Sequence, residues 1–377
     1  MVSIGIDYTP AYEQGGGIGR YVRELVSALA KVDQDTNYSL FVAGVNGDLP
    51  PQAGRNFVWK PTHITPKWFA RIWHRARVPI PVQWFVGSVD LFHATDFVLP
   101  PTSPAIPTVL TVHDLSYVHV PESASPALKK YLDVVVPRSI QHSTFILADS
   151  EATRNDIVSL YGTSPEKVCV LLSGVSSVFK QINDTDLSMT TRRKYNLDDF
   201  QFIFTVGTVQ PRKNYTRLIE ALGILHSHGI KIHLVISGGK GWLDNPIYET
   251  IAQRHMEEYV HFIGFADDAD LPVLYNMAAC LAFPSLYEGF GLPILEAMAC
   301  GAPVVTSNVS SLPEVAGDAG LLVDPYDVDA LANALQSLIQ DEPLRQQLIE
   351  KGLERVKEFT WEKSARQLLG IYQTLLA

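Results

Sequence analysis

Two acidic residues form an E-x7-E pair in one glycine-rich segment, and their surroundings predict a different task for each. Glu288 precedes Gly289–Gly291, where glycines favour a loop over a helix. Glu296 follows Pro293, which suits the first position of a helix, and Gly301 suits the end of that helix. We expect Glu288 on a loop, where its carboxylate can reach a sugar, and Glu296 on a first helical turn, where it can bind both hydroxyls of a ribose. Compensation of the helix dipole is the alternative, but it gives no reason for the glycines.

Two adjacent cations, Arg212 and Lys213, lie in a second segment, 207–214, between a strand pattern and a helix pattern. At such a position a guanidinium can grip a diphosphate as a fork, and an ammonium can bind it as a point charge. Solvated surface charge is the alternative interpretation.

A third segment, Gln14–Tyr21, is rich in glycine and leads into a helix pattern. Glycines let the backbone approach an anion closely, and the start of a helix adds free N–H groups. The segment has neither the G-x-G-x-x-G pattern of dinucleotide binding nor the Gly-Lys-Ser/Thr ending of a P-loop. A flexible turn is the alternative interpretation.

The elements that must position these segments alternate between short apolar runs and helical patterns, which predicts parallel sheets covered on both faces. Twelve strands are too many for one compact open sheet, so we expect two doubly wound domains with ligand loops beyond the carboxyl ends of the strands. The predicted strands are 2–6, 39–43, 91–93, 108–112, 145–148, 168–172, 202–206, 233–237, 259–263, 280–283, 304–306 and 321–323. The clearest predicted helices are 17–29, 214–226 and 329–339.

Composition excludes several classes of protein. The 377 residues are 46% hydrophobic and 19% charged, which is typical of a folded chain of about two domains. The net charge of −10 excludes a basic nucleic-acid-binding protein. No signal-like start and no apolar run of 18 residues is present, which predicts a cytoplasmic protein. The three cysteines are too few and too scattered for a disulfide framework or a zinc site, and we expect buried apolar roles for Cys169, Cys280 and Cys300.

One basic stretch interrupts this acidic chain. Residues 49–89 contain no acid and carry Arg55, Lys60, Lys67, Arg71, Arg75 and Arg77 among Trp59, Trp68, Phe69, Trp73, Trp84 and Phe85. If residues 66–78 are helical, one face presents Trp68, Phe69, Ile72, Trp73 and Ala76, and the other presents Lys67, Arg71 and Arg75. Such a helix can lie on an anionic membrane, here through residues 60–85, or can pack its aromatics into its own domain.

These motifs together resemble the retaining nucleotide-sugar glycosyltransferases of family 4, which have the GT-B fold. The resemblance covers nearly the whole chain and rests on motifs in the right order: Gly-Gly-Ile-Gly-Arg-Tyr at 16–21, Thr-Val-His-Asp-Leu at 111–115, Pro-Arg-Lys-Asn at 211–214, the Glu288/Glu296 pair and Ser-Leu-Pro-Glu-Val at 311–315. It implies two Rossmann-like domains that face each other across a cleft. We therefore expect an acceptor-binding domain at 1–173, a linker at 174–198, a nucleotide-sugar-binding domain at 199–361 and a last helix, 362–377, that packs back on the first domain.

The resemblance also implies roles for individual residues. Arg212 and Lys213 would stabilise the leaving diphosphate, Glu296 would hold the ribose, and Glu288 would contact the donor sugar near its 3-hydroxyl. His113 would face the sugar with its carbonyl or ring near the 6-hydroxyl, although a satisfied core histidine is the alternative. The implied catalytic set is His113, Glu288, Lys213 and Arg212. The implied donor-binding set is Gly16, Gly17, Arg212, Lys213, Gly238, Phe265, Glu288, Gly289, Phe290, Gly291, Leu292 and Glu296.

Three further residues bear on these roles. Many relatives carry an arginine directly after the glycine at Gly207, where this chain has Thr208, and we expect Arg212 to supply that charge. In some relatives the backbone N–H at the position of Pro293 donates to a phosphate. Proline has no N–H, so this chain cannot make that contact. His93, at a similar strand end, is a candidate contact for the acceptor.

The implied reaction is a retaining, metal-independent transfer of a hexose from a nucleotide-diphospho-sugar to a sugar or lipid-linked acceptor. GDP-mannose is the first donor to consider and UDP-glucose the second, and the implied location is cytoplasmic, with peripheral contact at the inner face of the cell membrane. Four D-x-D pairs have the spacing of a metal site, but we expect structural roles for all of them: Asp33/Asp35, Asp184/Asp186, Asp268/Asp270 and Asp327/Asp329, with Asp327 as a helix N-cap. A sugar-nucleotide epimerase of GT-B fold and a non-catalytic GT-B binding module are the alternative functions.

Overall fold

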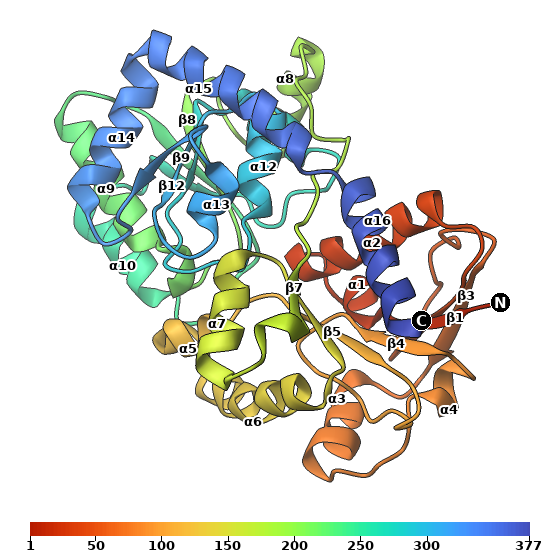
Figure 1. Ribbon diagram of the computed structural model, residues 1–377. Coiled ribbons are helices and arrows are strands. Elements are labelled where there is room, and N and C mark those ends of the chain that lie inside the picture. The colour runs from red at the N-terminus through yellow and green to blue at the C-terminus, as the bar shows by residue number, and fades with distance from the viewer. The chain divides into compact units, whose positions relative to one another are not determined.

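The computed structural model describes residues 1–377, which form two compact units (Figure 1). The first unit comprises residues 1–115, 126–174 and 360–377, and the second comprises residues 116–125 and 175–359. Each unit is a parallel sheet with helices between its strands, so the predicted fold class of two doubly wound α/β domains is confirmed.

The linker predicted at 174–198 is wrong in its boundaries, because most of it belongs to the second unit and folds as the helix α8 (Thr185–Lys194). The carboxylate of Asp184 caps this helix by accepting the backbone N–H of Leu187 at 2.9 Å. Only Thr191 of α8 is buried, so the helix lacks the apolar periodicity by which sequence analysis finds helices.

The segment 116–125 was also expected in the first domain and instead belongs to the second unit. There the ring of His119 stacks on that of Tyr287 with centroids 4.9 Å apart, and Trp242 donates its indole N–H to the carbonyl of Ser123 at 2.6 Å. These partners are more than a hundred residues away along the chain, which is why local patterns did not reveal the assignment.

The first unit is built on seven parallel strands in the order β3-β2-β1-β4-β5-β6-β7. The strands β5 and β6 have the predicted bounds, whereas β3 was not predicted. It contains Pro61, which lacks a ladder N–H and is tolerated because β3 lies at the edge of the sheet. The strands are β1 (Ser3–Asp7), β2 (Asn37–Ala43), β3 (Phe57–Thr62), β4 (Leu91–Ala94), β5 (Thr108–Val112), β6 (Phe145–Ala148) and β7 (Val168–Val170).

The helices of the first unit include the last helix of the chain, α16, which lies beside α2 (Figure 1). Trp361, at the start of α16, packs its ring against Tyr21 of α2 with centroids 5.7 Å apart. The helices are α1 (Thr9–Glu13), α2 (Gly17–Val32), α3 (Pro66–Phe69), the π-helical turn η1 (Ala70–Arg75), α4 (Gln83–Val86), α6 (Pro126–His142), α7 (Glu151–Tyr161), the 3-10 turn η3 (Pro165–Lys167) and α16 (Trp361–Leu376).

The second unit is built on six parallel strands in the order β10-β9-β8-β11-β12-β13. The bounds of β8, β9 and β11 are those predicted. The strands are β8 (Phe202–Val206), β9 (His233–Ser237), β10 (Val260–Phe262), β11 (Cys280–Phe283), β12 (Val304–Ser307) and β13 (Gly320–Val323). The helices are α5 (Ser116–His119), η2 (Pro121–Ser123), α8, η4 (Pro211–Lys213), α9 (Tyr215–Ser227), α10 (Asn245–Arg254), α11 (Leu271–Met277), α12 (Leu292–Ala299), α13 (Leu312–Ala316), α14 (Val328–Gln340), α15 (Glu342–Arg355) and η5 (Val356–Glu358).

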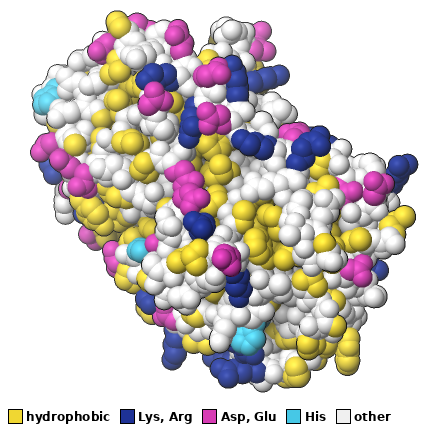
Figure 2. Space-filling view, in the orientation of Figure 1, with side chains coloured by type: hydrophobic (Ala, Val, Ile, Leu, Met, Phe, Trp, Pro, Cys, Tyr) yellow, Lys and Arg dark blue, Asp and Glu magenta, His cyan; other side chains and the backbone are white.

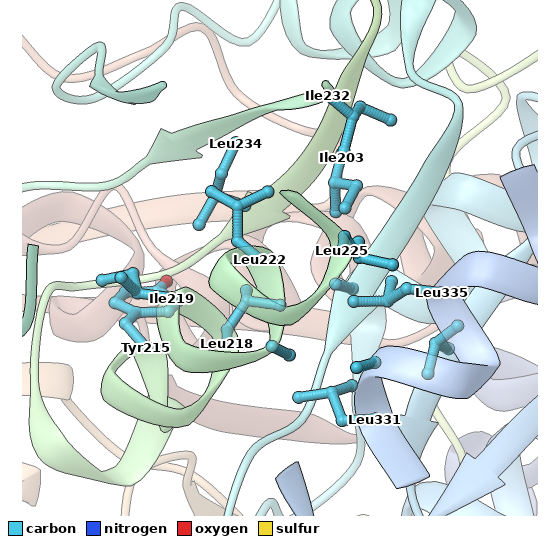
Figure 3. Close-up of a cluster of buried hydrophobic side chains, with 14 of the residues drawn as sticks. Ile203, Tyr215, Leu218, Ile219, Leu222, Leu225, Ile232, Leu234, Leu331 and Leu335 are labelled. Atoms are coloured by element: carbon cyan, nitrogen blue, oxygen red, sulfur yellow. The ribbon is translucent and has the colours of Figure 1, made fainter. Parts of the chain in front are cut away.

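A core of buried aliphatic side chains fixes the sheet of the second unit against α9 and α14 (Figure 3). Leu218, Leu222 and Leu225 recur at helical spacing along α9, and Leu331 and Leu335 do so along α14. The two helices pack against one another and cover one face of the sheet, so the loop that leads from β8 into α9 has a rigid base.

The helix predicted at 66–78 is wrong in part, because only the short helix α3 and the π-helical turn η1 form there. A π-helix has more residues per turn than an α-helix, so Phe69 and Trp73 align and stack at 4.1 Å, whereas Trp68 and Ala76 turn outward. Of the five side chains expected on one apolar face, only Phe69 and Trp73 are buried.

All three cysteines are free, and Cys280 and Cys300 are buried as expected. Cys169 is only half-buried, which corrects the expectation for that residue; it lies on β7, at the edge of the sheet. No helix of the structure is long and apolar enough to cross a membrane.

Candidate functional site

In the second unit, two loops leave the carboxyl ends of the neighbouring strands β8 and β11 and are fastened together. The N–H of Leu286 donates to the carbonyl of Arg212 at 2.9 Å. Asn214, in the left-handed region at φ 60°, donates its amide N–H groups to the carbonyls of Pro284 at 3.0 Å and Pro325 at 2.7 Å. The cations of one loop are therefore held at a fixed place beside the acid of the other.

Glu288 accepts hydrogen bonds from both predicted cations. Its Oε1 lies 2.6 Å from Nζ of Lys213, and its Oε2 lies 2.5 Å from Nη1 of Arg212, which also donates to the carbonyl of Tyr287 at 2.8 Å. Lys213 and Glu288 are buried. Burial alone would raise the pKa of Glu288, but Arg212 and Lys213 outweigh it and lower the pKa to about 2. The cluster is thus one buried carboxylate shared by two cations.

Gly207 is required for this arrangement. A Cβ atom at this position would lie 2.6 Å from Cε of Lys213, so only glycine leaves room for the lysine side chain to pass. The φ of Gly207 is 145°, a conformation that other residues rarely adopt. The ammonium of Lys213 also lies 4.7 Å from the centroid of the Phe283 ring at the end of β11.

The backbone around Glu288 is held by two serines to which sequence analysis gave no separate role. Ser310 accepts the N–H of Glu288 at 3.0 Å, and the hydroxyl of Ser311 lies 2.9 Å from the carbonyl of Glu288 and 2.7 Å from that of Phe290. Ser311 begins one of the family-like motifs, whereas Ser310 carried no signal that could have found it. The loop position of Glu288 is as predicted.

Glu296 lies on α12, but one residue further along the helix than predicted. The helix begins at Leu292, so Glu296 is its fifth residue and the first turn contains no acid. The expectation of a first-turn carboxylate was wrong because Leu292, before the proline, is already helical. Glu296 is buried and accepts the hydroxyl of Tyr275 at 2.8 Å. At the other end of α12, Gly301 has φ 76°, as expected for a residue that ends a helix.

The remaining donor-binding predictions fall into two groups. Around the Glu288 loop, Phe290 is buried, Leu292 is half-buried, and Gly291 caps α12 at φ 118°. At the ends of β9 and β10, a Cβ atom on Gly238 would lie 1.9 Å from the carbonyl oxygen of Gly207, so close backbone packing is sufficient reason for this glycine. Phe265 is 60% exposed, which leaves its ring accessible to a ligand.

In the first unit, the glycine segment lies where predicted, between β1 and α2. Gly16 is the N-cap of α2, and a Cβ atom on Gly16 or Gly17 would meet nothing within 4 Å, so both backbones are open to a ligand. Gly19 differs, because a Cβ atom there would lie 1.9 Å from the carbonyl oxygen of Gln14. Gly19 is therefore explained by packing and not by ligand approach.

His113 follows β5 and is buried, with an acceptor at each ring nitrogen. Nδ1 lies 2.8 Å from Oδ2 of Asp149, and Nε2 lies 2.8 Å from the carbonyl oxygen of Thr95. Both nitrogens must donate, which requires the imidazolium form. Burial would lower the pKa of His113, but Asp149 and Asp96 outweigh it and raise the pKa to about 9. The ring is therefore fully engaged, and the carbonyl, which accepts the Thr153 hydroxyl at 3.3 Å, is the group left for a sugar hydroxyl.

The ring of His93 is held by partners of its own unit. It is buried, with Nδ1 at 2.7 Å from the hydroxyl of Tyr372 on α16 and Nε2 at 2.8 Å from that of Thr111. Burial and the nearby His113 lower its pKa to about 3, so the ring is neutral. These contacts favour a structural role for His93, and the sequence did not reveal them because the partner on α16 lies 279 residues away.

One aspartate of each D-x-D pair has a structural partner. Asp327 caps α14 by accepting the N–H of Ala330 at 2.8 Å, as predicted. Asp184 caps α8, Asp33 accepts the hydroxyl of Tyr38 at 2.7 Å, and Asp270 accepts that of Tyr195 at 2.8 Å.

Comparison with known proteins agrees with this fold and these loops. Two family models match the chain, one described as glycosyltransferase family 4 over residues 15–177 and one as glycosyl transferases group 1 over residues 189–355. The O-antigen chain mannosyltransferase B of Escherichia coli is 34% identical over 370 residues, covering 95% of this chain and 96% of that protein.

Two solved structures share the whole fold. Sucrose-phosphate synthase of Thermosynechococcus elongatus superimposes with a TM-score of 0.76 at 22% identity, covering 100% of this chain and 99% of that one. HepE of Anabaena, solved in complex with UDP and glucose, superimposes with a TM-score of 0.74 at 20% identity, covering 99% and 100%.

The fold is that of the GT-B glycosyltransferases. The chain belongs to glycosyltransferase family 4, as its motifs indicated, and it is a nucleotide-sugar-dependent hexosyltransferase.

Proposed function

We propose that this enzyme transfers mannose from GDP-mannose to a glycan or lipid-linked acceptor, with retention of configuration and without a metal ion. The choice of mannose is supported by the E. coli relative, which is an O-antigen chain mannosyltransferase. The same relative supports a role in the assembly of a cell-surface polysaccharide. UDP-glucose is the second donor to test.

The observation that carries the donor assignment is the Arg212–Lys213–Glu288 cluster. When the bond between the sugar C1 and the phosphate oxygen breaks, negative charge develops on the departing diphosphate. Two fixed cations at a strand end are suited to stabilise that charge. In the proposed mechanism the diphosphate pairs with Arg212 and Lys213, and Glu288 turns from these cations toward a hydroxyl of the donor sugar.

Retention follows if the leaving phosphate itself accepts the proton of the acceptor hydroxyl. The acceptor oxygen then bonds to C1 on the face from which the diphosphate departs, and no protein nucleophile is needed. His113 is a positioning residue in this proposal, because its ring already donates both protons to acceptors of its own unit. Its carbonyl is assigned to the donor sugar, as the family resemblance implies.

The proposal is tested by the release of nucleoside diphosphate from a donor panel. The purified chain is supplied with GDP-mannose or UDP-glucose, with and without glycan and lipid-linked acceptors, and with and without EDTA. We expect acceptor-dependent release of GDP that EDTA does not change, and an α-linked product from the α-linked donor. Lys213→Ala should lower the rate of GDP release by about 100-fold, whereas Lys231→Ala, a change at an exposed lysine of the same unit, should leave that rate unchanged.

The other outcomes of this assay contradict the proposal in different ways. Isomerised sugar nucleotide without transfer indicates an epimerase, and no release from any donor indicates a binding module. Loss of activity in EDTA refutes the metal-independent mechanism. We also propose a cytoplasmic location with peripheral contact at the inner face of the cell membrane.

A further inference from the structure

Two tryptophans stand out from the surface of the first unit. Trp84 on α4 is 77% exposed and Trp68 on α3 is 54% exposed, which makes them the two most exposed of the six tryptophans of the chain. Large aromatic side chains are usually buried or half-buried, so two in one region require an explanation.

The packing beneath them fixes this exposure. Phe69 and Phe85, the sequence neighbours of Trp68 and Trp84, meet edge to face with centroids 5.1 Å apart, and both pack against the buried Trp73. The elements α3 and α4 are therefore held together by an aromatic cluster under the surface. Because Phe69 and Phe85 point into this cluster, the adjacent side chains of Trp68 and Trp84 point toward solvent.

Three arginines of the same stretch, one of them against the Trp68 ring, have no acidic partner. Arg71, Arg75 and Arg77 are exposed, and the guanidinium of Arg71 lies 4.9 Å from the centroid of the Trp68 ring. No ion pair forms at Arg71, Arg75 or Arg77, and residues 49–89 contain no acid at all. Lys67 differs from these three arginines because it lies near an acid, Glu13. Burial raises the pKa of Glu13, and the charge of Lys67 opposes that rise.

The helix α6 extends the same surface. Arg138 on α6 lies near enough to His74 of η1 to add to the effect of burial in lowering the pKa of that histidine to about 4. α6 also exposes Lys130, Leu128 and Val134. Figure 2 shows Lys and Arg side chains gathered at the lower end of the view, where Figure 1 places α3 and α6, with hydrophobic side chains beside them.

We propose that this basic aromatic surface, formed by Trp68, Arg71, Arg75, Arg77 and Trp84, docks on an anionic lipid bilayer. The rings of the two tryptophans enter the interfacial region, and the three arginines lie against the lipid headgroups. This inference rests on the peripheral location given in the proposed function and deepens it, since it names the surface and the kind of lipid that hold the enzyme.

The combination of groups favours a bilayer over other anionic partners. A soluble polyanion would be bound by the arginines alone, and the two exposed indole rings would make no contact with it. A neutral apolar partner would not select a stretch from which every acid is missing. Indole rings and guanidinium groups side by side match the interface of an anionic membrane, where the rings lie among headgroups and the cations meet lipid phosphates.

The test is vesicle sedimentation with the full chain and no donor. The vesicles are phosphatidylcholine alone, or phosphatidylcholine with about a third phosphatidylglycerol. The first variant carries Arg71→Gln, Arg75→Gln and Arg77→Gln, and its control carries Arg193→Gln, Lys231→Gln and Lys357→Gln, three exposed cations of the second unit. The second variant carries Trp68→Ala and Trp84→Ala. Circular dichroism and the affinity for GDP establish that each variant is folded.

We expect binding to anionic vesicles only, with a blue shift of tryptophan emission. The arginine variant should lose about 100-fold in partition coefficient, at roughly 1 kcal/mol for each basic residue, and its control should not. The tryptophan variant should lose about tenfold or more and most of the blue shift. Equal binding to neutral vesicles, an unaffected arginine variant or a tryptophan variant that binds like the parent would each overturn the proposal. Because no donor is present, these outcomes leave the proposed transfer reaction untouched.

Discussion

Replacement of Glu288 by glutamine should weaken turnover and yet strengthen the binding of nucleoside diphosphate. In the structure both carboxylate oxygens of Glu288 are engaged by Arg212 and Lys213, the same cations that the proposal assigns to the diphosphate. Carboxylate and diphosphate therefore compete for one pair of cations. Glutamine keeps the shape of the side chain and removes the charge.

The size of the effect follows from the pKa of Glu288. Burial opposes ionisation, but Arg212 and Lys213 lower the pKa from 4.5 to about 2, a net preference for the charged form of about 3 kcal/mol. We expect the variant to lose about 2–3 kcal/mol of unfolding free energy at pH 7. In the variant, Arg212 and Lys213 no longer pair with a charged residue 288. If roughly half of the 3 kcal/mol then contributes to diphosphate binding, the Kd for GDP falls about tenfold. Turnover should fall by about 100-fold or more, since the contact of Glu288 with the sugar is lost.

The sign of the pH dependence provides a further check. A depressed pKa stabilises the fold above the unfolded-state value of 4.5, and that stabilisation is lost as the pH falls toward about 2. The stability gap between the parent and the variant should therefore narrow across this window.

The assay is calorimetric titration with GDP, together with urea unfolding and initial rates of GDP release. Glu257→Gln, an exposed acid of the same unit, is the matched control and should change none of them. Weaker or unchanged GDP binding in a folded Glu288→Gln protein would refute the reasoning, because it would mean that the diphosphate does not use these cations.

Three further predictions follow from the same contacts. Lys213→Ala should lower kcat/KM by about 100-fold and raise the Kd for GDP about tenfold, as measured by initial rates and calorimetry, and unchanged values would remove Lys213 from the site. Asp149→Asn should lower the pKa of His113 from about 9 to below 6.5, which NMR titration of the ring measures. Because that pKa is raised on folding, the stability it supplies is full below pH 6.5 and lost as the pH rises through about 9, and urea unfolding should show this loss in the parent and not in the variant. Gly207→Ala should displace Lys213 and reduce turnover, whereas Gly239→Ala, whose Cβ would meet nothing within 4 Å, should leave initial rates unchanged.

The strands and the chemistry-bearing loops could be predicted because their signals are local. Five strands have the predicted bounds, since short runs of buried apolar residues between turn residues have few other interpretations. The loop position of Glu288 follows in the same way from the glycines that flank it. Where the local signal was weak, as in α8 with its single buried residue, the prediction failed.

Partners that are remote in sequence could not be predicted. The ring of His93 is hydrogen-bonded to Tyr372 on α16, and the ring of His113 to Asp149. Neither pairing can be recognised from the spacing of residues in the sequence. The contact of Ser310 with the backbone N–H of Glu288 could not be predicted either, because one serine in a loop forms no recognisable pattern. The sequence therefore indicated which residues carry charge at the strand ends but not which of them neutralise one another.

The same contacts explain how, in the proposed function, an acidic half of the chain binds an anionic donor. Residues 174–377 carry a net charge of −9, yet exposed charges further away than about 10 Å are screened by salt. The charges nearest to a ligand at the proposed donor site are those of the cluster, in which Arg212 and Lys213 both contact the carboxylate of Glu288. These contacts hold both cations at the strand ends, so in the proposed function they can pair with the diphosphate whatever the sign of the surrounding surface.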